Sequence, residues 1–128
     1  MVGLFFRKEE AMKREVIVGD KKVELVYNAA TPFVVKQMFN YDIFKFFANS
    51  DSMDVWERIP KLEQLAYAMA MQAKMSTREA MEAGEGFLDW LDQFEFDEVT
   101  KDLIDATVDM WVNGNKSTSE AKNPQGPL

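Results

Sequence analysis

The stretch KLEQLAYAMAMQAK, residues 61–74, decides the fold that we expect for this chain. Apolar side chains recur in it at the three- and four-residue spacing of one helix face, namely Leu62, Leu65, Ala66, Met69 and Ala73. Its small alanines allow other helices to approach closely. We therefore expect a central helix, with Pro60 in its first turn and a separate short turn before it, capped by Ser52 or Asp54.

Towards the N-terminus, residues 15–27 have the pattern of a β-hairpin. The runs EVIV and KKVELVY flank Gly19 and Asp20, a pair that suits a two-residue turn. Val23, Leu25 and Tyr27 share one face by alternation, which leaves the charged neighbours towards water. At the N-terminus, Gly3, Phe5 and Phe6 fit the start of a strand, whereas RKEEAMKRE has the composition of an exposed helical turn. We leave both alternatives open and treat residues 1–11 as an N-terminal extension.

Between the hairpin and the central helix lies NAATPFVVKQMFNYDIFKFF, residues 28–47. We expect Thr31 to be the N-cap of a helix whose first residue is Pro32. A threonine side-chain oxygen can accept a hydrogen bond from a backbone N–H of the first turn, and proline has no N–H that would need a partner there. Asn40 interrupts the pattern, and Asp42 then caps a second helical segment that carries Phe44, Phe46 and Phe47. These three phenylalanines are either a crossing point of core helices or a surface for another subunit or client.

After the central helix, Ser76 and Glu79 form a predicted capping box. A short helix follows in FLDWLDQFEF, residues 87–96, and a last amphipathic helix is expected to end at Asn113 and Gly114. Residues 116–128 are polar and contain two prolines, which predicts a flexible, disordered tail.

The expected fold is thus mainly α (α+β). A hairpin packs on a helical body of about four to six helices at 31–112, within one domain at 12–115.

Composition excludes several classes of chemistry. The chain has no cysteine and no histidine, which removes disulfides, thiolate zinc sites and imidazole bases. A net charge of -7 opposes nucleic-acid binding, and no segment is apolar enough to span a bilayer. Carboxylates crowd the region from residue 82 to 109, but they fall on the polar faces of the predicted helices, where acids are usually only solvated. We expect no enzyme activity, no cofactor and no metal site.

The remaining chemistry is that of protein interaction. Aromatic residues and methionines are abundant, and such side chains build adaptable interaction surfaces as well as cores. An acidic surface beside apolar anchors attracts basic partners. The candidate residues are the aromatic and acidic block Phe87, Asp89, Trp90, Asp92, Phe94 and Phe96, followed by Phe44, Phe46 and Phe47.

The order of these segments resembles the tail assembly chaperones of long-tailed (siphovirus-type) phages of Gram-positive bacteria. The pieces that carry the resemblance are the hairpin, YNAATPFVVKQMFNYDIFKFF, LEQLAYAMAMQAK, FLDWLDQFEF and a helix closing in MWVNGN, over about residues 12–122. The resemblance implies a non-catalytic protein of the bacterial host cytoplasm, absent from the mature virion. It would bind the tape-measure protein in several copies and keep it soluble, with self-association left open.

The same resemblance implies that this chain is the short product of a gene with programmed frameshifting. In such families a longer form recruits the major tail (tube) protein. Ala121, Lys122 and Asn123 can be encoded as GCA AAA AAC, which contains a slippery heptamer, so the codons there test the idea. Residues 1–11 precede the usual family start, and EAGEG at 82–86 departs from the expected pattern.

A rival interpretation belongs to a different functional class. A small acidic phage regulator, or a nucleic-acid mimic, would sequester a basic host protein. Acids spread evenly over several faces favour that role, whereas acids beside aromatic anchors favour the chaperone.

Overall fold

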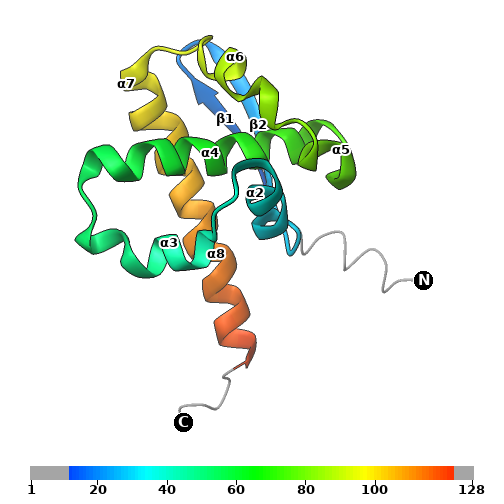
Figure 1. Cartoon of the computed structure of the whole chain (residues 1–128), viewed down its shortest axis with the longest axis vertical. Coiled ribbons are helices and arrows are strands. Elements are labelled where there is room, and N and C mark those ends of the chain that lie inside the picture. Colours follow the sequence, from blue (N-terminus) through cyan, green and yellow to red (C-terminus); the bar gives the residue numbers. More distant parts are fainter. Residues whose placement is uncertain (1–11, 123–128) are drawn as a thin grey trace.

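The computed structural model describes residues 12–122, and the backbone alone for 116–122. It confirms a mainly α (α+β) fold, in which an N-terminal antiparallel hairpin packs against helices (Figure 1). In chain order the elements are β1 (Met12–Val18), β2 (Lys21–Tyr27), α2 (Thr31–Phe39), α3 (Ile43–Asn49), η1 (Ser50–Ser52), α4 (Val55–Lys74), α5 (Thr77–Met81), η2 (Gly84–Gly86), α6 (Phe87–Leu91), α7 (Phe96–Glu98), the π-helical η3 (Val99–Leu103) and α8 (Ile104–Lys122).

The hairpin is confirmed, but its first strand is longer than predicted. Val18 pairs with Lys21 across the two-residue turn, where Gly19 has a φ of 65°. A positive φ at the first turn residue matches a type II′ turn, which suits the twist of a hairpin. β1 begins at Met12 and not at residue 15, because residues 12–14 pair with residues 25–27 of β2. Arg14 lies on the inner side of β1 and forms an ion pair with Asp109 at 2.8 Å. That partner is too distant in sequence for a local pattern to reveal it.

The central helix is confirmed as part of α4, which crosses in front of the hairpin (Figure 1). Its buried residues run from Leu65 to Met71. The predicted break before Pro60 is wrong, since α4 starts at Val55 behind a capping box formed by Asp54 and Glu57. Pro60 thus lies inside the helix, where it cannot donate a hydrogen bond to the carbonyl of Trp56, and α4 continues through it.

The entrance to α2 also differs from the prediction. Helix α2 starts at Thr31, and Ala30 is its N-cap without a side-chain cap bond. Thr31 is fully buried, and its Oγ1 accepts from the Asn28 N–H at 3.0 Å and donates to Gln72 Oε1 at 2.7 Å. Its hydroxyl joins the α2 entrance to α4 and does not cap the helix.

The connection from α2 to α3 follows the prediction. Asn40 adopts the left-handed conformation at φ 58° and ends α2. The Asp42 carboxylate then accepts hydrogen bonds from the N–H groups of Phe44 and Lys45, which confirms it as the cap of α3. The predicted capping box of Ser76 and Glu79 is present as well, at the start of α5.

The end of the last helix was predicted wrongly. α8 continues past Asn113 and Gly114 to Lys122. Gly114 serves close packing instead, because a Cβ at this residue would lie 2.4 Å from Cε2 of Tyr27. The predicted disordered tail is therefore wrong for residues 116–122, which extend α8. Residues 123–128 of that tail, and the N-terminal extension at residues 1–11, lie outside the described residues. Within residues 12–122, each helix is too short or too polar to reach across a bilayer.

Glu63 on α4 gives the fold a pH dependence that can be measured. Partial burial raises the pKa of its carboxyl, so the charged form is disfavoured in the folded state. Near pH 7 the Glu63 carboxylate therefore lowers stability, and this loss diminishes as pH falls towards the raised pKa. We expect Glu63→Gln to raise the melting temperature by about 1 to 3 °C at pH 7.

Thermal unfolding of both proteins from pH 5 to pH 8 checks this. The difference should narrow towards pH 5, whereas the exposed control Glu85→Gln should leave the melting temperature unchanged across the series. A Glu63→Gln protein that is less stable at pH 7 would contradict the burial argument.

Candidate protein-interaction surface

The predicted block at residues 87–96 divides between core and surface. Phe87 packs edge-on against Phe39 and Tyr67, with ring centroids 5.2 and 5.4 Å apart. Trp90 contacts Tyr67 at 5.3 Å and Phe94 at 5.2 Å. Phe87, Trp90 and Phe94 are all partly buried against the core. Their main role is therefore to hold α6 onto α2 and α4.

The two acids of this block remain in water. Asp89 on α6 and Asp92, the C-cap that follows it, are exposed, and Leu88 is exposed too. Tyr67 lies beneath, and its hydroxyl donates a hydrogen bond to the carbonyl of Ala83. Burial, and then the charge of Asp89, raise the pKa of that hydroxyl, so Tyr67 stays a neutral donor.

Two of the three phenylalanines of α3, Phe44 and Phe47, pack against Trp111 of α8. Phe46 is buried, and Phe47 lies flat against Trp111 with centroids 4.7 Å apart. The ring of Phe44 is 5.1 Å from Trp111 and remains 53% exposed. The crossing-point alternative therefore describes Phe46 and Phe47, and only Phe44 keeps a surface large enough for a partner.

The predicted residue that is most clearly available to a partner is Phe96. It is 53% exposed on α7, and its ring stacks on that of Trp56, which is 67% exposed at the start of α4. The ring centroids are 6.3 Å apart with an interplanar angle of 20°. Val55 is also exposed. We call Val55, Trp56 and Phe96 the aromatic platform; its two elements, the start of α4 and α7, lie on the left of Figure 1.

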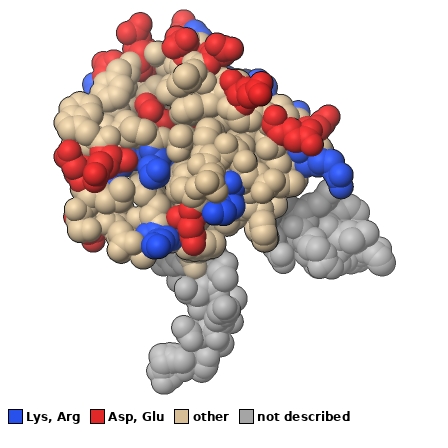
Figure 2. Space-filling view, viewed as in Figure 1, with Lys and Arg blue, Asp and Glu red and all other residues tan. Residues whose placement is uncertain are grey.

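Carboxylates flank the aromatic platform on both of its elements. Asp54 and Glu57 adjoin Val55 and Trp56, while Glu95 and Asp97 adjoin Phe96 in the chain, and all four acids are exposed. Figure 2 shows acidic side chains gathered along the upper and left margins of this face. The platform thus combines large apolar contact area with negative charge, a combination that suits a partner with an apolar face and basic residues.

Sequence reasoning did not identify Trp56 as an interaction residue. A signal existed, because Trp56 lies off the helical stripe of Leu62, Leu65 and Met69 and aligns with Glu63 instead. A tryptophan on the polar side of an amphipathic helix has no place in the core and is typical of a binding surface.

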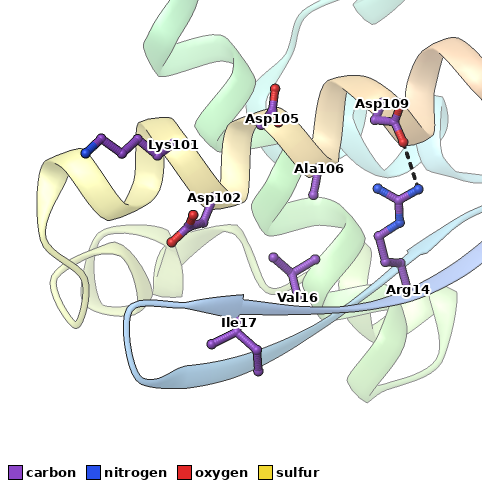
Figure 3. A pocket seen from close by; sticks show the side chains of 8 residues that line it. All are labelled: Arg14, Val16, Ile17, Lys101, Asp102, Asp105, Ala106 and Asp109. Atoms are coloured by element: carbon purple, nitrogen blue, oxygen red, sulfur yellow. Dashed lines mark hydrogen bonds and ion pairs between the residues drawn. The ribbon is translucent and has the colours of Figure 1, made fainter.

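A second acidic feature lies between β1 and the last helix. This groove of about 310 Å³ is lined by Arg14, Val16, Ile17, Lys101, Asp102, Asp105, Ala106 and Asp109. In Figure 3, Arg14 and Val16 point from the strand towards the helix, whereas Ile17 points away. The ion pair of Arg14 with Asp109 spans the groove. The carboxylates of this groove could also bind basic side chains of a partner.

Within residues 12–115 no set of three acids stands close enough to hold a metal ion. Every buried polar side-chain atom in the same part of the chain has a hydrogen-bond partner. What these surfaces offer chemically is contact and charge.

The predicted frameshift residues fall at the end of the described chain. Ala121 and Lys122 belong to the backbone of α8, and Asn123 lies outside the described residues. Comparisons of this chain with protein-family models, with curated proteins and with solved structures found no match.

Proposed function

We propose that this protein is a phage tail assembly chaperone that binds the tape-measure protein and keeps it soluble until the tail tube forms around it. The proposal starts from the resemblance in the order of its segments. It also takes from that resemblance a longer frameshifted form that brings in tail-tube subunits. The role needs no covalent step, no cofactor and no membrane.

The observation that carries the proposal is the aromatic platform with its flanking acids. Tryptophan and other aromatic side chains supply much of the binding energy at protein interfaces, and two of them are stacked and open to solvent here. A long helical client with unpaired apolar faces would cover them. The carboxylates at Asp54, Glu57, Glu95 and Asp97 would attract basic residues on that client and speed its capture.

The acids of the platform also weigh against the rival role of a nucleic-acid mimic. They stand beside exposed rings, whereas a mimic of the phosphate backbone presents charges without apolar anchors between them. In the mimic interpretation, a basic host protein would bind this chain through charge alone, and moderate salt would release it.

The experiment is co-expression with the tape-measure protein of the same phage. The wild-type chain should hold that protein in the soluble fraction and co-purify with it. The double variant Trp56→Ala and Phe96→Ala should weaken this binding at least about tenfold, since truncating interface hot spots commonly costs that much.

Phe33→Ala is the matched control, because Phe33 is an aromatic residue on α2 that is 69% exposed and lies away from the platform. It should retain full binding. Equal co-purification by wild type and the platform variant, with both folded by circular dichroism, would remove the platform from the proposal. A wild-type chain that leaves the tape-measure protein insoluble would overturn the proposed function itself.

A further inference from the structure

The outer edge of β2 is open for strand pairing. In a hairpin closed by a two-residue turn, the residues next to the turn exchange hydrogen bonds, and the pairs then alternate. Val18 and Lys21 are that first pair, so the backbone groups of Lys22, Glu24 and Val26 point away from β1. Within residues 12–115 no backbone or side-chain hydrogen bond reaches these outward groups. An unpaired strand edge is a template for another extended chain.

A hollow of about 300 Å³ lies along this edge, between β2, the end of α4 and α6. Ala70 and Trp90 give it an apolar wall, and Gln93 adds an amide. Lys21, Lys22 and Lys74 also line it, against one acid, Glu24. Lys21 and Lys22 make only loose, exposed ion pairs of 3.6 Å, with Asp20 and Glu15. Pairs of that kind are weak and can be exchanged for a partner's carboxylate.

The positive charge of this hollow is unusual for an acidic protein. The whole chain carries -7, and the groove at the opposite edge of the hairpin has three acids, Asp102, Asp105 and Asp109, against two basic residues, Arg14 and Lys101 (Figure 3). The two edges of one small sheet thus differ in electrostatic character. An acidic strand is therefore favoured at β2 over β1, which selects both the edge and the type of partner.

We propose that the outer edge of β2 binds an extended acidic peptide segment of a partner protein as a third strand. Its backbone pairs with Lys22, Glu24 and Val26. Side chains of one parity enter the hollow, where an apolar residue contacts Trp90 and carboxylates reach Lys21 and Lys74. Backbone pairing gives affinity, and the alternating side chains give specificity, as in other cases of strand addition. The hollow holds a few side chains, so the occupant is a single strand.

The probe is a fluorescent eight-residue peptide in which pairs of glutamates alternate with pairs of valines, so that each face of the strand carries both kinds of side chain. Its binding is measured by fluorescence anisotropy with the full chain. Binding should be saturable and should weaken with salt. The double variant Lys21→Glu and Lys74→Glu should bind about tenfold more weakly, because two attractive pairs become repulsive. Lys45→Glu, a reversal at an exposed lysine of α3, is the matched control and should bind as wild type does.

Two further peptides test the mode of binding. A version with N-methyl groups on alternate residues keeps the charges but cannot complete a strand ladder, so it should fail to bind. A version with lysine in place of the acids should also fail. Equal affinity for either peptide would overturn the proposal. So would a wild-type dimer that Lys74→Glu dissociates, since a second copy would then be the occupant.

This site is independent of the proposed function. The platform variant Trp56→Ala and Phe96→Ala should bind the acidic peptide normally even though it loses the tape-measure protein. Loss of peptide binding in that variant, with its fold intact, would contradict two separate surfaces.

Discussion

Replacing Thr31 with valine should lower the free energy of unfolding by about 2 to 4 kcal/mol, although the two side chains have nearly the same shape. The hydroxyl accepts from the Asn28 N–H and donates to Gln72 Oε1. Gln72 in turn donates to Asn28 Oδ1 at 3.2 Å, and that oxygen also accepts from the Ala30 N–H at 2.9 Å. Valine would leave the Asn28 N–H and Gln72 Oε1, both partly buried, without this partner, which is the costly direction for a polar network.

Chemical denaturation of the two proteins measures this difference. Thr107→Val is the matched control, because Thr107 is equally buried but its hydroxyl donates only to the Leu103 carbonyl one turn earlier in the helix. That carbonyl remains within the helical ladder, so the control should change stability by less than about 1 kcal/mol. Similar losses at both residues would show that the network around Thr31 has no special weight.

Gly114→Ala should destabilise the protein by about 1 to 2 kcal/mol, opposite in sign to the effect of alanine in an ordinary helix. Helix propensity alone favours alanine by about 1 kcal/mol. Here the new methyl group would meet the ring of Tyr27, with Cε2 at 2.4 Å and Cδ2 at 2.7 Å. The ring cannot retreat freely, because it packs edge-on against Trp111 at 5.6 Å. Overpacking therefore outweighs propensity.

A double-mutant cycle isolates this clash. In a Tyr27→Val background the ring is gone, and Gly114→Ala should then be neutral or stabilising. Thermal or chemical unfolding of the four proteins supplies the comparison. A Gly114→Ala change that stabilises the wild-type background would show that Tyr27 moves aside easily.

Elements with local causes were predictable from the sequence. The turn at Gly19 and Asp20, the cap at Asp42 and the box of Ser76 and Glu79 each depend on residues a few positions apart. The central helix is equally local, because its apolar spacing is contained within one segment. Such features follow from the pattern alone.

Features that depend on distant partners were not predictable. The ion pair of Arg14 with Asp109 joins residues far apart in the sequence, and Gly114 is needed because Tyr27 lies beside it. The predicted block at residues 87–96 divides between core and surface for the same reason. Trp90 packs against Tyr67, whereas Phe96 stacks on the exposed Trp56, and neither partner is near in sequence. Spacing shows that a residue is apolar and on a given face of its helix, but not which neighbour covers that face.

The contact between the hairpin and the last helix has a consequence for synthesis on the ribosome. Arg14 and Asp109, which form one of these contacts, are separated by 95 residues. At a rate of about 5 to 20 residues per second, roughly 5 to 20 s pass between the appearance of the two partners. During that interval the side of β1 that α8 will cover stays bare. Until α8 emerges, the newly synthesised chain exposes this surface and can be bound by cellular chaperones.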